Sequence, residues 1–274
     1  MKRPLVSICI PTYNSSDYIQ ETLQSVFDQT YDNIELLISD DASSDDTLAK
    51  VQQMIEKSSI PIILKTTSDN SGIEGNWNQA LSMASGTFIK LLPADDTLHP
   101  SCIETQVNAF EAHGNDIALV FCARKVVTRS GKALLTARFY PDQKIENHNL
   151  LKRCILSGTN VIGEPGAVLF RKSLADKVGS FNGEKPYVID LNYWIRLLKH
   201  GHAIAQYNAL STFRIDNNLS VRLGWSRFSE YSATIDAIRS QWNISVTVAS
   251  IGKLRALLNE ALRRCVHFVY RAVG

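Results

Sequence analysis

Several features that would place the chain in a particular class of protein are absent from it. The five cysteines, at positions 9, 102, 122, 154 and 265, have no metal-like spacing, and their odd number argues against a disulfide framework. Some of them lie in apolar runs, and we interpret these as small core residues of a protein in a reducing compartment. The net charge of +2 gives no reason to expect nucleic acid as a partner.

Long apolar runs are also missing. No segment approaches the about 20 apolar residues that a membrane-spanning helix needs, and the start of the chain, from Met1 to Pro4, lacks the pattern of a signal peptide. We therefore expect a cytoplasmic protein. Its 274 residues, of which 45% are hydrophobic and 20% charged, suffice for one large domain or two small ones.

Strands and helices are expected to alternate in the first half of the chain. Apolar runs predict strands at 5–10, 34–39, 60–66 and 87–92. Helices are expected at 76–84 and behind two capping segments, Ser15–Asp17 and Ser43–Asp46. This order predicts an α/β protein with a Rossmann-like, mostly parallel central sheet that helices cover on both faces.

The second half of the chain is less regular. Its expected elements are strands at 117–127, 167–170 and 204–210, a hairpin turn at 129–132, a polar loop at 138–149, and helices at 190–200, 226–243 and 250–272. The last two helices would form a C-terminal helical extension.

Polar side chains follow each of the first four expected strands. These clusters are Pro11–Asn14, Asp40–Asp45, Asp69–Gly72 and Asp95–Asp96. The carboxyl ends of parallel strands meet at one edge of a sheet, where ligands bind in such folds. The sequence therefore predicts a cleft lined by carboxylates, an aromatic ring and flexible turns.

Asp95 and Asp96 form the most informative of these clusters. Desolvating an ionised carboxylate costs several kcal/mol, so two of them at a strand end need a partner. Mg²⁺ is a suitable one, because it takes one or two carboxylates together with substrate phosphates. The alternative is a solvated turn in which an aspartate caps a helix that opens between Thr97 and Pro100.

The ordered set of motifs resembles the family 2 glycosyltransferases of GT-A fold, over about residues 4–222. Its landmarks are Val6–Asn14, Ser39–Asp45, Asn70–Gly72, Asp95–Asp96, Gly166–Arg171, Val178–Phe181, and Asp190 followed by Trp194 and Arg196. The resemblance implies a catalytic domain at 1–225 before the extension at 226–274. Within it, residues 1–116 would bind the nucleotide sugar and residues 117–225 the acceptor.

The resemblance also implies how the donor would be bound. Tyr13 would stack on the nucleotide base, with Pro11 beside it. Asp41 would bind the edge of the base, with Asp40 next to it, and Asn70 would belong to the same nucleotide-sugar site. Asp41 could instead be only a turn former, since Asp-Ala-Ser-Ser is favourable turn chemistry, and Tyr13 could be a simple aromatic at a strand end.

The remaining implied roles concern the metal and the reaction. Asp95 would hold the ribose or the metal, and Asp96 would hold a Mn²⁺ or Mg²⁺ ion that bridges the two phosphates. Asp190 would be the general base that takes a proton from the acceptor hydroxyl in a single, inverting displacement; a positioned base contributes roughly 10²–10⁴ in rate. Asp190 could also be only a helix cap.

Three residues of the second half are possible contributors to the acceptor side. Glu164, in a Gly-Glu-Pro-Gly turn, is a weak candidate for contact with the acceptor. Trp194 lies on an apolar helix stripe and could be core, and Arg196 could be a surface charge or could orient Asp190 through a salt bridge.

One position departs from the family pattern. The commoner motif has an aspartate where this chain has Pro93, which puts the number of metal ligands in doubt. No Gln-x-x-Arg-Trp element of the processive synthases is present, so we expect transfer of one sugar, as in the assembly of bacterial surface polysaccharides. Alternatives are a nucleotide-sugar-binding protein without catalysis, or a metal-dependent phosphohydrolase, which would need more His and Asp ligands.

The last expected helix combines an apolar stripe with positive charge. The stripe comprises Leu254, Leu257, Leu258, Ala261, Leu262, Cys265, Phe268 and Val269, and the basic residues are Lys253, Arg255, Arg263, Arg264, His267 and Arg271. Such a helix over 250–272 could lie on the inner face of the plasma membrane, which would suit a lipid-linked saccharide acceptor. It could equally pack on the catalytic domain or on a second subunit in a homo-oligomer.

Overall fold

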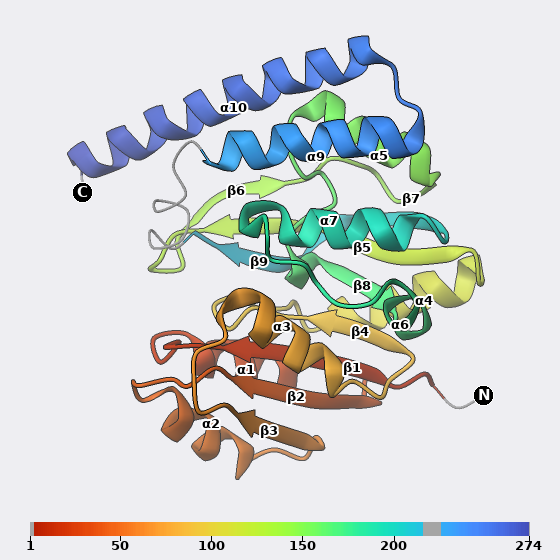
Figure 1. The fold of residues 1–274 in the computed structure, drawn as a ribbon. Coiled ribbons are helices and arrows are strands. Elements are labelled where there is room, and N and C mark those ends of the chain that lie inside the picture. Colours follow the sequence, from red (N-terminus) through yellow and green to blue (C-terminus); the bar gives the residue numbers. More distant parts are fainter. Residues whose placement is uncertain (1–2, 216–225, 274) are drawn as a thin grey trace.

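The computed structural model describes residues 3–215 and 226–273 (Figure 1). Its strands are β1 (Val6–Thr12), β2 (Ile34–Asp40), β3 (Ile62–Thr66), β4 (Phe88–Leu91), β5 (Ile117–Val127), β6 (Ala133–Ala137), β7 (Gln143–Ile145), β8 (Val168–Arg171) and β9 (His202–Arg214). Its helices are α1 (Ile19–Phe27), α2 (Thr47–Ile55), α3 (Gly72–Ser82), α4 (Cys102–His113), α5 (Asn147–Ser157), α6 (Lys172–Val178), α7 (Ile189–Leu198), α9 (Ser226–Trp242) and α10 (Val246–Val273). Two short 3-10 turns, Pro165–Ala167 and Pro186–Val188, precede β8 and α7.

The strands form one mixed sheet in the order β3-β2-β1-β4-β8-β5-β9-β7, and β6 pairs with β5. Strands β1 to β4 are parallel to one another, with Val6 level with both Ile34 and Phe88. Only β8, β7 and β6 run antiparallel to their neighbours in the described sheet. The expected alternation of strands and helices, and the mostly parallel sheet, are confirmed.

Both faces of the sheet are buried, because alternate residues of each central strand enter different cores. In β1, Ile8 and Ile10 pack with α1, α2 and α4, whereas Cys9 belongs to the core beneath α3 and α7. Figure 1 shows α3 and α7 in front of the sheet and α1 behind it. Burial on both sides explains why β1 is apolar apart from Ser7 and Thr12, which are buried and hydrogen-bonded.

The polar segment 138–149 is not the loop that its composition predicts. It contains β7 and the start of α5, a helix whose buried side chains are Leu150, Leu151, Cys154 and Ile155. The first turn of α5 is Asn-His-Asn, so the apolar spacing begins only at Leu150. Helix α6 was not expected either, and α4, expected only as the alternative opening between Thr97 and Pro100, begins at Cys102. The predicted cap of α1 is wrong: the helix begins after Tyr18 with no side-chain cap.

The two C-terminal helices pack over the second half of the sheet. α10 contacts α5 and α9 along one side, which confirms a helical extension, and Figure 1 shows it as the outermost helix. Each helix in the described ranges is too short or too polar to pass through a bilayer. The domain boundary expected at 225, and the side chains of the stripe from Cys265 onward, lie outside the described residues.

Candidate active site

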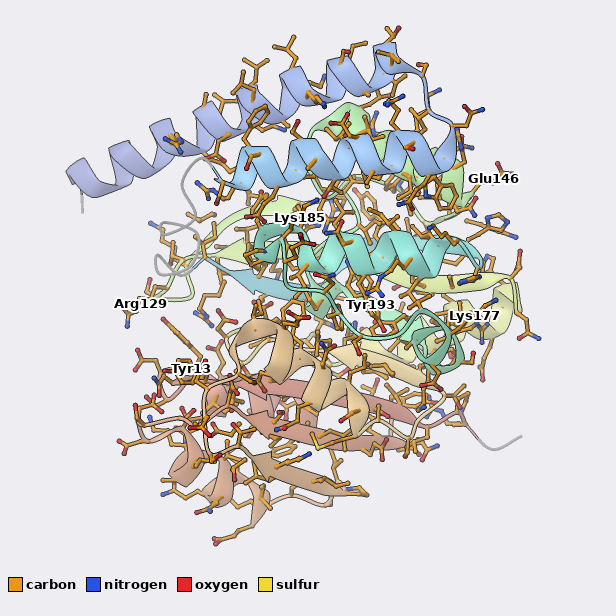
Figure 2. All side chains as sticks on the ribbon, in the orientation of Figure 1. Tyr13, Arg129, Glu146, Lys177, Lys185 and Tyr193 are labelled. Carbon is orange, nitrogen blue, oxygen red and sulfur yellow. The ribbon has the colours of Figure 1, made fainter. Side chains whose placement is uncertain are left out.

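The polar ends of the first four strands meet at one edge of the sheet, as expected. Thr12 and Asp40 are level in the register of β1 and β2, and the Thr12 hydroxyl donates a hydrogen bond of 2.9 Å to Asp40. The backbone N–H of Asp41 bonds to the Thr12 carbonyl, and that of Thr67 to the Asp40 carbonyl. Figure 2 shows Tyr13 at this end of the sheet.

Asp40 and Asp41 are both buried and hydrogen-bonded within the protein. Asp40 accepts bonds from the backbone N–H and the hydroxyl of Ser43, which fixes the turn after β2. Asp41 accepts the N–H and hydroxyl of Ser71 and the N–H of Gly72, at the start of α3. A carboxylate has about four lone-pair sites, so the structure leaves Asp41 little capacity for a further donor.

The residues around this turn differ in accessibility. Tyr13 is 49% exposed, Asn70 is exposed and accepts the N–H of Gly72, and Pro11 is buried in β1. Ala42 has φ of 60°, a left-handed conformation that is uncommon for residues other than glycine and that clusters at functional sites. An exposed ring beside a tightly held turn can receive a flat ligand.

Asp96 is a buried carboxylate in the turn after β4. Its Oδ1 accepts the backbone N–H of Arg214 at 2.8 Å, and its own N–H bonds to the carbonyl of Pro93. Burial, followed by the charge of the neighbouring Asp95, raises the pKa of Asp96 well above its usual value. A buried carboxylate beside a second carboxylate is an arrangement that a bound cation would stabilise.

Arg214 holds this turn in place and is a residue that the sequence analysis missed. Its Nε donates to the Asp95 carbonyl at 2.9 Å, and its guanidinium also bonds to Glu21 and lies over the ring of Tyr18. Its side chain is 4% exposed. The sequence did contain a signal: Arg214 is the single Lys, Arg, Asp or Glu residue in β9. A charged side chain in such a buried strand requires a polar partner.

Asp190 lies in the first turn of α7, on the other half of the sheet. Its Oδ1 accepts the N–H of Leu191, and its Oδ2 accepts the amide N–H of Asn160 at 3.1 Å. Burial, and then the charge of Glu164, raise the pKa of Asp190 to about 7. A carboxylate with this pKa exchanges its proton near neutral pH, which is what general-base catalysis needs.

Glu164 connects the two acidic groups. Its charge raises the pKa of both Asp96 and Asp190. The segment that carries it contacts both groups, since Asn160 donates to Asp190 Oδ2 and Gly166 lies against Asp96. Glu164 itself forms an ion pair with the buried Arg124. Gly166 lies against the turn after β4, since a Cβ there would be in van der Waals contact with Leu92 and, at 3.5 Å, with Asp96 Oδ2.

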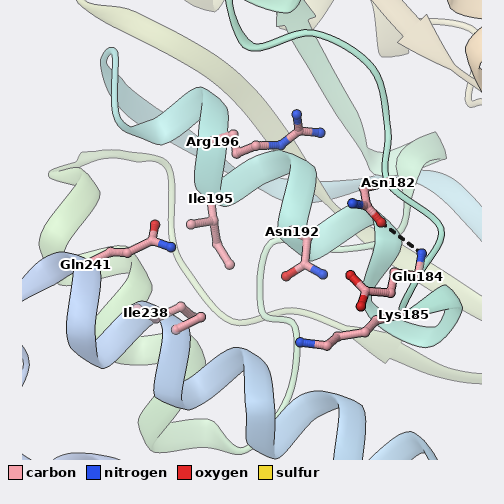
Figure 3. A pocket seen from close by; sticks show the side chains of 9 residues that line it. Asn182, Glu184, Lys185, Asn192, Ile195, Arg196, Ile238 and Gln241 are labelled. Atoms are coloured by element: carbon pink, nitrogen blue, oxygen red, sulfur yellow. Dashed lines mark hydrogen bonds between the residues drawn. The ribbon is translucent and has the colours of Figure 1, made fainter.

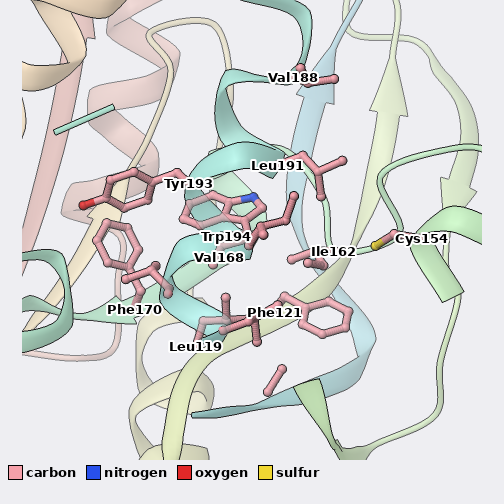
Figure 4. Close-up of a cluster of buried hydrophobic side chains, with 14 of the residues drawn as sticks. Leu119, Phe121, Cys154, Ile162, Val168, Phe170, Val188, Leu191, Tyr193 and Trp194 are labelled. Atoms are coloured by element: carbon pink, nitrogen blue, oxygen red, sulfur yellow. The ribbon is translucent and has the colours of Figure 1, made fainter. Parts of the chain in front are cut away.

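Trp194 is a core residue that also supports the site. It is fully buried and packs with Phe170 and Tyr193 (Figure 4), and its indole N–H donates to the Gly163 carbonyl at 3.1 Å. Asn160 donates to the same carbonyl. Trp194 therefore holds the turn that carries Glu164 and does not itself reach the acidic groups by any described contact.

Arg196 is not placed against Asp190, so the suggested salt bridge is wrong. Its guanidinium donates to the carbonyls of Val178 and Ser180. Arg196 also lines a pocket of about 210 Å³ between α7, α9 and the loop at 182–185 (Figure 3). None of the acidic groups described above lines that pocket, which is separate from the candidate site.

The acidic groups have a donor set that suits Mg²⁺ or Mn²⁺. No group of three or more His, Cys, Asp and Glu side chains that could hold a metal exists among the described residues, so the protein would supply Asp95 and Asp96 and little else. Mg²⁺ is bound in this way, through one or two carboxylates together with phosphates and water. Asp95 and Asp96 therefore fit a metal ion that is bound together with a phosphorylated ligand.

Comparisons with known proteins identify the family and the fold. The model of the family described as glycosyl transferase family 2 matches residues 7–179. The chain is 35% identical over 158 residues to the Escherichia coli UDP-Glc:alpha-D-GlcNAc-diphosphoundecaprenol beta-1,3-glucosyltransferase WfgD, with 58% of this chain and 59% of the relative covered. It is 28% identical over 220 residues to the putative teichuronic acid biosynthesis glycosyltransferase TuaG of Bacillus subtilis, with 79% and 81% covered.

A third relative, the uncharacterized protein MT1568 of Mycobacterium tuberculosis, is 31% identical over 207 residues. The chain spans 62% of that relative's length, and the match covers 72% of this chain. Alignments to the mycobacterial and Escherichia coli proteins thus leave more than a third of each relative without a counterpart here.

Two solved structures share the fold. Residues 1–349 of Staphylococcus aureus TarS, in complex with UDP-GlcNAc, superpose with a TM-score of 0.69 at 21% identity, covering 86% of this chain and 66% of that one. The mannosyltransferase PcManGT of Pyrobaculum calidifontis, in complex with GDP-Man and Mn²⁺, superposes with a TM-score of 0.61 at 18% identity, covering 96% and 76%. The expected GT-A fold is confirmed, and the chain belongs to glycosyl transferase family 2.

Proposed function

We propose that this glycosyltransferase moves one sugar from a nucleoside-diphosphate sugar to an acceptor hydroxyl, with inversion at the anomeric carbon. The observation that carries the proposal is that one segment, residues 160–166, contacts carboxylates from opposite halves of the sheet: Asn160 donates to Asp190 Oδ2, and Gly166 lies against Asp96. Asp96 would hold a metal ion at the donor phosphates, and Asp190 would accept the proton of the acceptor hydroxyl. In this proposal residues 1–116 bind the donor and residues 117–225 bind the acceptor, ahead of the extension at 226–274.

The first half of the sheet would bind the nucleotide and its phosphates. The exposed ring of Tyr13 would stack on the base, with Asn70 and the tightly held turn at Asp40 and Asp41 forming the edge of that site. Asp95 and Asp96 would hold Mn²⁺ or Mg²⁺. Such a metal, when bound, offsets the negative charge that develops on the leaving nucleoside diphosphate.

Asp190 would take the proton of the attacking hydroxyl. An inverting displacement needs the base and the leaving group on opposite sides of the sugar, and Asp190 comes from α7 whereas Asp95 and Asp96 follow β4. Asn160 holds Asp190 Oδ2 in place. The ion pair of Glu164 with Arg124 keeps a negative charge near Asp190, which favours the protonated product of this step.

The acceptor we favour is a saccharide on a lipid diphosphate carrier. WfgD, by its description, acts on a diphosphoundecaprenol-linked sugar, and TuaG is described as an enzyme of teichuronic acid biosynthesis. A role in the assembly of a bacterial surface polysaccharide follows from this similarity. The competing function is nucleotide-sugar binding without catalysis, for which Asp190 would have no use as a base.

A thermal-shift panel tests donor binding. Uridine- and guanosine-diphosphate sugars are added with Mn²⁺ or with a chelator, and the donor class is expected to raise Tm only when the metal is present. A ligand at about 100 times its Kd adds about 2.7 kcal/mol of stability, equivalent to roughly 5–10 °C for a domain of this size. If no nucleotide sugar shifts Tm with or without metal, the proposal fails.

The pH dependence of transfer reports on Asp190. Because burial raises the pKa of Asp190 to about 7, its base form is lost as pH falls through 7, and kcat/KM for the acceptor should fall about tenfold per pH unit below that value. Initial rates at saturating donor between about pH 5.5 and 8.5 measure the profile. A rate that stays constant down to about pH 5 would exclude a base with this pKa.

A further inference from the structure

α10 presents large apolar side chains to solvent. Leu254, Leu258 and Leu262 are 59%, 54% and 64% exposed, and Ile251 and Leu257 beside them are exposed as well. These five residues, which we call the leucine face, recur at spacings of three and four and therefore form one stripe along the helix. Surface helices ordinarily turn such a stripe toward the core, so its outward position needs a separate explanation.

The opposite side of α10 attaches the helix to the domain through small residues. Ala249, Gly252 and Ala256 are buried there, and a Cβ on Gly252 would come within 2.5 Å of the Ile155 carbonyl oxygen in α5. This close approach leaves no room for leucine side chains between the two helices. The leucine face cannot turn inward while α10 stays on α5.

Polar contacts fix the rotation of α10 about its axis. Glu260, on the inner side, forms a buried ion pair with Arg227 of α9. Asn259 donates to the carbonyls of Ser157 and Gly158, and Arg255 donates to the carbonyl of Leu156. These carbonyls end α5 and would otherwise lack partners. The outward position of the leucine face is thus specified by the packing and hydrogen bonding of the helix.

Positive charge borders the leucine face on both sides. Lys253 and Arg264 lie along one margin of the stripe and Arg255 along the other, by their helical spacing. Lys253 pairs with Asp236 of α9 and Arg264 with Glu260, which Arg227 also pairs with, so this border keeps a positive excess. Glu260 is the single acidic residue in the sequence of α10, and it is buried and paired. An apolar stripe between basic margins is complementary to an anionic lipid surface, where the leucines enter the acyl boundary and the basic groups remain among the head groups.

We propose that the leucine face of α10 docks on an anionic membrane surface. A second copy of the chain is a poorer occupant, because an isologous contact between two leucine faces would bring the basic margins of both copies together. Figure 1 shows α10 running toward the side of the molecule at which β1 and β2 end, the side that carries Tyr13 in Figure 2. The inference goes beyond the transferase reaction and does not depend on it.

Vesicle sedimentation without donor or acceptor tests the proposal. The wild-type chain is expected to sediment with vesicles of phosphatidylcholine and phosphatidylglycerol, more weakly with phosphatidylcholine alone, and less as NaCl rises to about 0.5 M. The double variant L254E/L258E should lose partitioning by on the order of 10–100-fold, because two apolar side chains no longer enter the bilayer. Both positions are exposed, so folding should be retained, and circular dichroism checks this.

The matched control is the double variant Q53E/I63E. It introduces the same charge change at exposed positions of α2 and β3, at the opposite edge of the sheet. Because these added charges lie away from α10, its binding to vesicles should stay within about twofold of that of the wild type. Equal loss in both double variants would overturn the proposal. The proposal would also be overturned if the wild type does not bind vesicles but forms a dimer by light scattering, and L254E/L258E is monomeric.

Discussion

Asp190→Asn is expected to lower kcat by about 10²–10⁴, because the variant has no group at that position that can take the acceptor's proton. Donor affinity should change less than about twofold, since Asp190 belongs to α7 whereas the donor residues follow β1 to β4. The nucleoside diphosphate released with donor, acceptor and Mn²⁺ measures kcat. Calorimetric titration of the donor in the presence of Mn²⁺ measures affinity.

The control for this variant is Asp176→Asn, which removes an exposed carboxylate of α6 that pairs only with Lys172 in the described structure. It should keep the wild-type kcat, since exposed ion pairs contribute little. The acid limb of the pH profile near pH 7 should be present in the control and absent from the residual activity of Asp190→Asn. If Asp190→Asn keeps the wild-type rate of transfer, Asp190 is not the general base.

The arrangement of the first half could be predicted from sequence because its signals are local. Each apolar run ends in a polar cluster, and parallel pairing then brings the clusters to one edge of the sheet whatever the details of the loops. The register of Thr12 with Asp40 is a direct consequence. Asp190 was found through resemblance, since its own segment gave only a helix with an acidic first turn.

The supporting residues could not be predicted because their partners are distant along the chain. Arg214 bonds to residues more than a hundred positions earlier, and Asn160 reaches Asp190 from a turn that has no periodic pattern. Lys90 is fully buried in β4 and donates to the Gly166 carbonyl. A charge inside an apolar strand shows that some partner must exist, but not which one it is.

The orientation of α10 shows the same limit. Its apolar stripe predicts an amphipathic helix, and hydrophobic burial alone would direct that stripe toward the domain. The structure instead buries Gly252 and Ala256, because a close contact with α5 and the ion pair of Glu260 decide the orientation. The same sequence pattern is compatible with either side facing inward, so only the packing of α5 and α9 distinguishes them.

Asp96→Asn is expected to reduce transfer by at least about 10² and to stabilise the apo protein at the same time. The loss of activity follows from removing a carboxylate that would hold the metal at the donor phosphates. The Mn²⁺-dependent rise in Tm with donor should disappear with it. Asparagine keeps an oxygen for the Arg214 N–H, so the local hydrogen bond can survive and the turn can stay folded.

The gain in stability follows from the direction of the Asp96 pKa. Burial and the neighbouring Asp95 raise that pKa, so the folded state holds the proton more tightly than the unfolded state, and ionisation destabilises the fold as pH rises. Removing the charge should stabilise the apo protein by about 1–3 kcal/mol at pH 8. The advantage should shrink toward pH 5, because the folded and unfolded wild-type states differ less in bound protons as pH approaches the ordinary pKa of an aspartate.

Chemical denaturation at these two pH values measures the difference, with Asp69→Asn as the control for removal of an exposed carboxylate near the same sheet edge. The control should alter stability by less than about 0.5 kcal/mol at either pH. A carboxylate with a structural role would behave in the opposite way, because its loss would weaken the fold and the activity together. Lower stability of Asp96→Asn at pH 8, with the Mn²⁺ response intact, would therefore assign Asp96 to the scaffold and leave Asp95 as the metal-binding carboxylate.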